Sequence, residues 1–288
     1  MAQIAYVDGH YLPLSRAGVN VEDRGYQFSD GVYEVFALRQ GQLVDEGAHL
    51  DRLEKSLNEL SIPQPISRAA LKLVIRETMR KNNLAHERAF GVVYLQITRG
   101  VAPRNHIYPD KMRPILVITV RPQNPQDLER VRENGIEVVS HPDLRWARCD
   151  IKSISLLPNI LARQHAKNAM AQEAWLVDEQ GFVTEGAATN AWIVTQDDVL
   201  LTRQAEANIL PGITRAVLME ALLELGLSYE TRAFTIEEAQ QAKEAFSTAS
   251  TMTIFPVVKI DGQPVQNGKP GALSLQLFDE YQKKSTKS

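Results

Sequence analysis

Apolar side chains recur at steps of three and four residues in two stretches of the first third of the chain. The first stretch, residues 49–60, carries a stripe of leucines that predicts a helix with one buried face. The stripe consists of Leu50, Leu53, Leu57 and Leu60. Ser67 favours the cap position of a second helix, whose apolar positions are Leu71, Val74, Ile75 and Met79.

Other stretches alternate in polarity or form short apolar runs, and these predict strands. In the first half they cover residues 4–7, 32–38, 90–98 and 114–120, with hairpin turns at Asp8-Gly9 and Gln40-Gly41. In the second half they cover residues 136–140, 174–178, 190–194, 199–201, 245–247 and 256–260. Helices are expected there at residues 160–171, at 212–225 and near the C-terminus. Because strands do not alternate strictly with helices, the pattern argues against a doubly wound parallel sheet.

Residues 121–126 contain two prolines and no apolar residue, which is typical of a linker. A length of 288 residues suits two domains. We therefore expect an N-terminal domain at residues 1–120, a linker at 121–126 and a C-terminal domain at 127–288.

Composition narrows the possible functions. The formal net charge of −3 lacks the basic excess of nucleic-acid-binding proteins. The single cysteine, Cys149, excludes an internal disulfide and fits a reducing compartment. We interpret it as a small buried residue and not as a nucleophile. The first residues lack the features of a signal peptide, and no apolar run is long enough for a membrane helix, so we expect a cytoplasmic protein.

Three separated features carry candidate chemistry. Lys152 lies in the sequence Asp-Ile-Lys-Ser, Glu185 follows later in Val-Thr-Glu-Gly, and Gly212-Ile213-Thr214 opens a predicted helix. A pyridoxal phosphate site uses a lysine for the Schiff base, an acid for the pyridine nitrogen and helix-start amides for the phosphate. Taken singly, Lys152 and Glu185 also fit solvated surface residues, and Thr214 also fits an ordinary helix cap.

A long loop, residues 99–109, joins two predicted strands and carries Arg104 and His106. Alternate side chains of an extended segment share a face, so both could point at one anion. Pro103 restricts the chain just before them. The alternative is a mobile loop with two solvated side chains.

The chain resembles the class IV aminotransferases, the fold type IV pyridoxal phosphate enzymes. Within that family it is most similar to the branch that acts on D-amino acids, which the Arg-x-His element marks. The motifs that carry the resemblance lie, in the family's order, at residues 26–35, 49–53, 96–100, 104–106, 150–153, 183–186, 209–215, 250–251 and 256–257.

The resemblance implies an α+β fold with a smaller N-terminal α/β domain and a larger, β-barrel-like C-terminal domain with helices. It implies pyridoxal 5'-phosphate as cofactor, amino acids and 2-oxo acids as substrates, and a homodimer. No metal, nucleic acid or membrane partner is expected. Transamination between D-amino acids, such as D-alanine and D-glutamate, and 2-oxo acids, such as pyruvate and 2-oxoglutarate, is the implied activity.

The resemblance also assigns roles to single residues. Lys152 forms the Schiff base and carries the proton, while Glu185 pairs with the pyridine nitrogen. Leu210 packs against the ring. The remaining cofactor-binding residues hold the phosphate or open the helix beside it, and they are Arg52, Gly212, Ile213, Thr214, Ser250 and Thr251. The substrate carboxylate is bound by Tyr33, Arg104 and His106, the last two from the partner subunit.

Two positions depart from the family pattern. Ala187-Ala188-Thr189-Asn190 stands where a serine-rich run is expected, and Pro211 stands where a polar or basic residue is common. Two alternatives remain at this point. One is a branched-chain L-amino acid aminotransferase or an aminodeoxychorismate lyase of the same fold. The other is a non-catalytic binding protein, which would be expected to lack the lysine or the acid.

Overall fold

The computed structural model describes residues 3–285, which divide into two compact units. The first unit comprises the chain up to Asn124 together with Ile151–Ser155. The second comprises Pro125–Asp150 and the chain from Leu156 onward. The linker expected at residues 121–126 covers the last two residues of one strand and the first two of a helix. A short segment around Lys152 therefore belongs with the first unit, although the sequence places it inside the second half.

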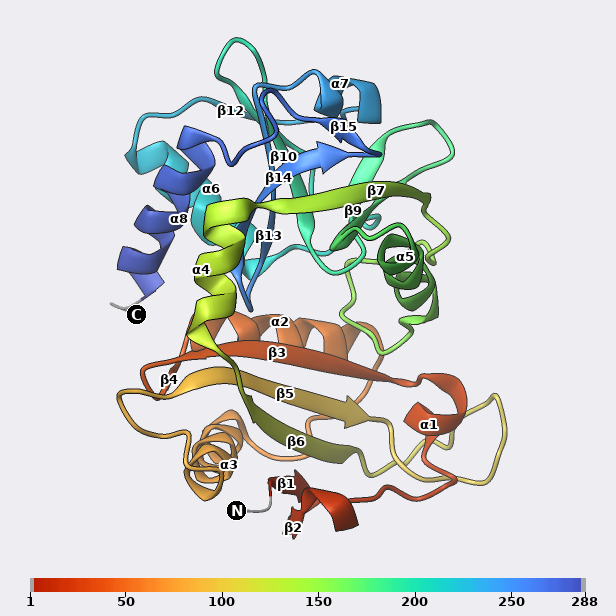
Figure 1. The fold of residues 1–288 in the computed structure, drawn as a ribbon. Helices are drawn as coiled ribbons and strands as arrows, with labels where there is room; N and C mark the ends of the chain where they lie inside the picture. The colour runs from red at the N-terminus through yellow and green to blue at the C-terminus, as the bar shows by residue number, and fades with distance from the viewer. Residues whose placement is uncertain (1–2, 286–288) are drawn as a thin grey trace. The chain divides into compact units, whose positions relative to one another are not determined.

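The first unit is built on a six-stranded antiparallel sheet (Figure 1). The strand order is β2-β1-β6-β5-β3-β4. The strands are β1 (Ile4–Val7), β2 (His10–Pro13), β3 (Gly31–Arg39), β4 (Gln42–Leu43), β5 (Phe90–Thr98) and β6 (Ile115–Pro122). Both predicted hairpin turns are present, and all four turn residues have the positive φ that such two-residue turns require: Asp8, Gly9, Gln40 and Gly41.

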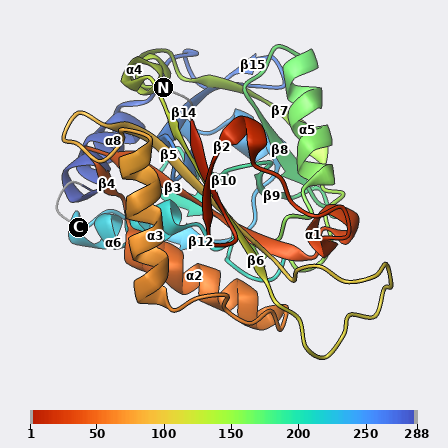
Figure 2. The ribbon, with the colours of Figure 1, turned by 90° about the horizontal axis from the view of Figure 1, so that it is seen from below.

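Helices α2 (Glu46–Glu59) and α3 (Arg68–Lys81) supply the apolar cover of this sheet (Figure 2). The leucine stripe of α2 and the apolar positions of α3 pack with alternate residues of β3, β5 and β6 in one core. Ser67 caps α3 as predicted, since its hydroxyl accepts a hydrogen bond from the Ala70 amide at 3.3 Å. The helical periodicity of the sequence thus identified this layer correctly.

A short helix that the sequence did not predict, α1 (Arg24–Phe28), precedes β3, and a 3-10 turn (Leu14–Arg16) lies before it. The Asp23 carboxylate caps α1 by accepting from the Gly25 amide at 2.8 Å, and Ser29 ends the helix in the left-handed conformation. The helix is missed in the sequence because its five residues sit between two turn signals. The long loop between β5 and β6 projects beside α1 (Figure 2).

The second unit is built on a curled nine-stranded mixed sheet. The strand order is β12-β11-β10-β13-β14-β7-β8-β9, with β15 paired to β14. The strands are β7 (Ile136–Pro142), β8 (Glu173–Val177), β9 (Val183–Gly186), β10 (Asn190–Val194), β11 (Leu200–Thr202), β12 (Tyr229–Thr231), β13 (Glu244–Ala249), β14 (Thr253–Ile260) and β15 (Gln263–Pro264). Parallel pairs join β7 to β8 and β14, and β11 to β12, while the other pairs are antiparallel.

The helices of the second unit are α4 (Pro125–Asn134), α5 (Leu157–Asn168), α6 (Ile213–Glu224), α7 (Ile236–Gln240) and α8 (Ala272–Ser285). The sequence did not predict α4, because its prolines suggested a linker. Proline is nonetheless favoured in the first turn of a helix, and Pro125 is the first residue of α4. None of the helices within residues 3–285 is long and apolar enough to cross a bilayer.

Candidate active site

Lys152 is held by its backbone against the start of β3 in the first unit. Its carbonyl accepts from the Tyr33 amide at 3.0 Å, and its own amide donates to the Ser56 hydroxyl of α2 at 3.2 Å. The next residue, Ser153, forms an isolated bridge with Val32. The lysine is therefore fixed between a strand and a helix, and only its side chain is free to move.

The Lys152 side chain is half-buried over an aromatic face. Its amine nitrogen lies 4.2 Å from the centre of the Tyr33 ring, which stacks on Tyr94 with centres 5.9 Å apart. Burial, followed by the nearby Tyr33, raises the pKa of Tyr94 to about 12. Within residues 3–285 the lysine has no carboxylate partner, so its amine is not committed to an ion pair.

Arg52 is buried and not solvent-exposed, because an acid on the inner face of β3 binds it. Glu34 accepts from Arg52 Nε at 2.8 Å and from Nη2 at 2.9 Å, and its second oxygen also contacts His49 Nδ1 at 2.8 Å. The Glu34 side chain is fully buried. His49 and Arg52 are one turn apart on α2, and both therefore reach the Glu34 carboxylate.

The charges in this cluster reinforce one another. Burial would raise the pKa of Glu34, but the charge and hydrogen bonds of Arg52 outweigh it and lower that pKa to about 2. Burial lowers the pKa of His49, although its hydrogen bond to Glu34 works in the opposite direction. Glu34 is consequently a permanent anion that orients the guanidinium of Arg52.

Glu185 is the penultimate residue of β9 in the second unit and is buried. One carboxylate oxygen accepts from the Leu210 amide at 3.0 Å and from Arg145, and the other accepts from Asn190 Nδ2 at 2.8 Å. A carboxylate offers about four acceptor positions, so one is left after these three contacts. Burial raises the pKa of Glu185, and the positive charge of Arg145 opposes that shift.

Arg145 connects Glu185 to a second acid. It donates through Nε and Nη2 to Asp143 at 2.9 and 2.7 Å, and Asp143 also accepts from the Thr184 hydroxyl at 2.7 Å. Burial would lower the pKa of Arg145, but the hydrogen bond of Asp143 and the charge of Glu185 raise it above its usual range. Arg145 is therefore a buried, permanently charged partner of Glu185.

The start of α6 offers an anion site next to this acid. Gly212 occupies the cap position without a side-chain cap, and a Cβ there would lie 2.0 Å from Asn190 Oδ1. The Thr214 hydroxyl is buried without a hydrogen-bond partner among the described residues. Because the first amides of a helix also lack intrahelical acceptors, Ile213 and Thr214 present donors to an anion.

Ser250 and Thr251 form the half-buried turn between β13 and β14. This turn lies at the end of the sheet where Asn190 pairs with Thr248. Asn190 in turn contacts Glu185 and the Leu210 carbonyl, at 2.8 and 3.0 Å. The structure thus brings the predicted residues of the second unit to one end of its sheet: Glu185, Leu210, Gly212, Ile213, Thr214, Ser250 and Thr251.

Arg104 and His106 are exposed on the long loop of the first unit, and both contact Phe28. The Arg104 guanidinium lies 4.6 Å from the centre of the Phe28 ring, and the His106 ring centre lies 5.5 Å from it. The chain bends at both residues, so the extended segment assumed from the sequence is wrong. Arg104 and His106 lie close together because both contact the Phe28 ring, and not because they alternate along a strand.

Several site residues escaped the sequence argument. Glu34 could have been found, because it is a charge on the inward face of an alternating strand. His49 could have been found as a polar residue one helical turn from Arg52. Arg145 lies in an irregular segment that gives no periodic signal. Two of the residues that replace the expected serine-rich run have structural roles. Ala187 packs in a small core, and Asn190 donates a hydrogen bond to Glu185.

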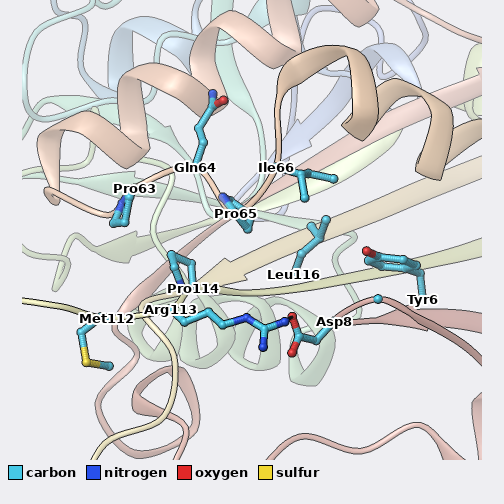
Figure 3. Close-up of a pocket in the computed structure, with 11 residues that line it drawn as sticks. Tyr6, Asp8, Pro63, Gln64, Pro65, Ile66, Met112, Arg113, Pro114 and Leu116 are labelled. Carbon is cyan, nitrogen blue, oxygen red and sulfur yellow. Dashed lines mark hydrogen bonds and ion pairs between the residues drawn. The ribbon is translucent and has the colours of Figure 1, made fainter.

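Two other features lie outside this chemistry. A hollow of about 410 Å³ in the first unit is lined by prolines, Tyr6 and the Asp8–Arg113 ion pair, and it contains none of the predicted site residues (Figure 3). Cys149 is buried, and burial raises the pKa of its thiol to about 11. A thiol with so high a pKa is a poor nucleophile, as expected from the sequence.

Comparison with known proteins identifies close relatives. The family model described as "Amino-transferase class IV" matches residues 31–260. A D-alanine aminotransferase of Bacillus licheniformis is 40% identical over 94% of this chain and 93% of its own length. A D-alanine aminotransferase of Listeria monocytogenes is 37% identical over 98% of this chain and 96% of its own length.

Solved structures show the same fold. The branched-chain amino acid aminotransferase of Escherichia coli superposes with a TM-score of 0.89 at 22% identity, covering 99% of this chain and 95% of that one. A hypothetical aminotransferase from Mycobacterium tuberculosis, solved in a PLP-bound form, superposes with a TM-score of 0.81 at 22% identity. That match covers 96% of this chain and 97% of the other. The expected α+β fold, with a larger, curled C-terminal sheet, is confirmed.

Proposed function

The chain belongs to the class IV aminotransferase family, and on that premise we propose that it is a pyridoxal 5'-phosphate-dependent D-amino acid transaminase. It exchanges the amino group between D-amino acids, such as D-alanine and D-glutamate, and 2-oxo acids, such as pyruvate and 2-oxoglutarate. The observation that carries this proposal is the 40% identity to a D-alanine aminotransferase over nearly the whole chain. The fold likeness to branched-chain enzymes at 22% identity does not discriminate between substrates.

The side chains of the second unit fit the cofactor. A phosphate at the start of α6 would satisfy the buried Thr214 hydroxyl, which otherwise lacks a partner among the described residues, together with the amides of Ile213 and Thr214. Ser250 and Thr251 add donors from the neighbouring turn, and Leu210 supplies an apolar contact for the ring. When bound, pyridoxal phosphate supplies an electron sink for the substrate's α-carbon.

Glu185 is the residue we assign to hold a protonated ring nitrogen. Three donors already fix its carboxylate, and the one acceptor position that remains suits an N–H group. The nearby positive charge of Arg145 favours the ionised form of Glu185. An ionised acid in a buried position strengthens the protonation of the nitrogen, which the electron sink requires.

Lys152 is the group we assign to covalent attachment and proton transfer. Its amine has no acid partner among the described residues and lies over the Tyr33 ring, so it would be available to attach the cofactor and, once released as a free amine, to hold the proton taken from the substrate's α-carbon. Arg52, oriented by Glu34, adds a cation for the phosphate. Tyr33 donates its hydroxyl to the substrate carboxylate.

Arg104 and His106 complete the proposed carboxylate site from the partner subunit of a homodimer. A guanidinium forks onto a carboxylate through two parallel hydrogen bonds and so fixes its orientation. With the carboxylate fixed, only one enantiomer directs its α-hydrogen at Lys152. We also propose that residues 121–126 join the two domains and that the protein acts in the cytoplasm.

A half-reaction tests the proposal. The purified protein should absorb visible light, and addition of D-alanine alone should shift the absorbance and release pyruvate in amounts equal to the subunits. Lys152→Ala should show neither change, whereas Lys167→Ala, which alters an exposed lysine, should behave like the wild type. Pyruvate release by Lys152→Ala at the wild-type rate would contradict the assignment.

A further inference from the structure

We infer that Arg24 and Phe28 of α1 are positioning residues that set the conformation of the loop carrying Arg104 and His106. The inference rests on the proposed role of those two residues in binding the substrate carboxylate. Neither Arg24 nor Phe28 is assigned a contact with the substrate. They act on affinity through the loop alone.

The side chain of Arg24 clamps the loop by binding backbone carbonyls of the loop. The side chain is buried, and its Nη1 and Nη2 donate to the carbonyls of Asn105 and His106 at 2.6 and 3.2 Å. The Asn105 carbonyl belongs to the peptide unit that joins Asn105 to His106. Because the guanidinium is a rigid planar fork, two bonds to consecutive carbonyls fix the two peptide units on either side of His106, the first of which directly follows Arg104 and Asn105.

Asp30 holds the clamp in place. A single oxygen of its carboxylate accepts from Arg24 Nε and from Arg99 Nε, both at 2.8 Å. Arg99 also donates to the carbonyls of Leu60 and Ser61, which follow α2. Burial would raise the pKa of Asp30, but the hydrogen bonds from Arg99 and Arg24 outweigh it and lower that pKa. The anion between the two arginines therefore persists at neutral pH.

The helix that carries the clamp is itself tied to the strand from which the loop leaves. The Asp23 carboxylate, which caps α1, also accepts from the Thr98 hydroxyl at 2.8 Å. The Arg24 amide donates to the Gly100 carbonyl at 2.9 Å. Arg24 is thus fixed relative to the first residues of the loop as well as to its middle.

Phe28 provides the surface on which the two loop side chains lie. Its ring is approached by the guanidiniums of Arg24 and Arg104, at 4.8 and 4.6 Å from the ring centre, and by the His106 ring at 5.5 Å. A cation–π contact orients a guanidinium through the negative face of the ring. It restrains Arg104 without using its hydrogen-bond donors.

The result is a preformed group of two side chains, the Arg104 guanidinium and the His106 imidazole, on one aromatic face. In the part of the chain that the structure describes, neither Arg104 nor His106 has an ion-pair partner, and both are exposed. An acid beside Arg104 would have neutralised its charge, whereas the Phe28 ring orients the guanidinium and the His106 ring and leaves their hydrogen-bonding groups available. This arrangement suits a small carboxylate that arrives from outside the chain.

Two variants separate positioning from direct contact. Phe28→Leu removes the ring and keeps an apolar side chain, while Arg24→Lys keeps the charge and loses the fork. Each should raise KM for D-alanine about 10-fold, with kcat changed less than about 3-fold, because a displaced guanidinium loses the alignment of its charge-assisted hydrogen bonds to the carboxylate. Tyr26→Leu removes an exposed aromatic ring from the same helix and should match the wild type.

A readout that does not depend on activity is amide hydrogen exchange. Exchange of residues 99–114 should be faster in Arg24→Lys than in the wild type, while exchange in α3 stays unchanged. In an Arg104→Ala, His106→Ala background, Phe28→Leu should add less than about 2-fold to KM, since the ring acts through the two lost side chains.

The outcomes distinguish two failures. If Arg104→Ala leaves KM unchanged, the proposed carboxylate site is wrong. If Arg104→Ala raises KM but Phe28→Leu and Arg24→Lys leave both KM and loop exchange unchanged, only the positioning role is wrong. If kcat falls as steeply as KM rises in Phe28→Leu, the residue does not act by positioning the loop.

Discussion

Arg145 donates a hydrogen bond to Glu185 in the interior of the second unit, where the two side chains are only 8% and 5% exposed. Asp143 holds the other edge of the same guanidinium. Removing one member of a buried ion pair leaves an uncompensated charge, which is usually relieved by a change of protonation. The charge of Glu185 therefore depends on Arg145.

Arg145→Met tests this dependence through pH. Burial already raises the pKa of Glu185, and loss of the cation should raise it further. Because the proposed role needs the ionised acid, kcat of the variant should be low at neutral pH and rise with pH as Glu185 loses its proton. Arg148→Met is the control, since Arg148 is 43% exposed and pairs with Asp150. A pH profile of Arg145→Met parallel to the wild type would count against the coupling.

Glu185→Gln should leave the cofactor bound and lower kcat by more than about 100-fold, because a neutral amide does not hold the ring nitrogen protonated. Visible absorbance measures cofactor binding separately from turnover. Glu179→Gln, an exposed acid near β9, should be indistinguishable from the wild type. A Glu185→Gln rate within a factor of about 3 of normal would show that Glu185 is not needed to keep the ring nitrogen protonated.

The Glu34 cluster should govern acid stability. An acid whose pKa is lowered from 4.5 to about 2 contributes stability that is fully present above pH 4.5 and is lost as the pH falls through about 2. Such a shift corresponds to roughly 3 kcal/mol. The unfolding free energy of Glu34→Gln should be lower at neutral pH and should fall less on acidification than that of the wild type.

Urea titrations at several pH values between 5 and 3 measure this difference. Glu87→Gln alters an exposed acid of the same unit and should keep the wild-type pH dependence. Equal pH slopes for Glu34→Gln and the wild type would show that the low pKa of Glu34 does not contribute to folding.

Glu244 should anchor the C-terminal helix. Its two carboxylate oxygens accept from the amides of Leu273 and Ser274 at 2.8 Å each, at the start of α8. Glu244→Ala should destabilise the protein by about 2 kcal/mol or more, since hydrogen bonds to a buried charge are the stronger kind. Glu220→Ala on α6, which is exposed, should cost less than about 0.5 kcal/mol. Thermal unfolding of both variants measures the contrast.

Periodicity was sufficient to predict the framework around the site. The stripe of α2 and the alternation of β3 follow directly from side-chain burial, so their bounds came out within a few residues. The short helix α1 and the proline-led helix α4 were missed, because turn and linker signals dominate such segments.

The polar interior was harder to predict. Arg145 and Glu185 are 40 residues apart in the sequence, and only the folded sheet brings them together. Arg24 and Asn105 are separated by 81 residues in the same way. Local patterns carry no information on such contacts, so the family resemblance supplied candidate roles, while the partners that orient those residues had to come from the structure.

The selectivity of the enzyme for D-amino acids is tested most directly by one measurement. The ratio of kcat/KM for D-alanine to that for L-alanine, with 2-oxoglutarate as acceptor, should exceed about 100, because the wrong enantiomer cannot place both its carboxylate and its α-hydrogen. L-leucine should be as poor a substrate as L-alanine. A higher kcat/KM for L-leucine than for D-alanine would contradict the account and place the enzyme with the branched-chain aminotransferases.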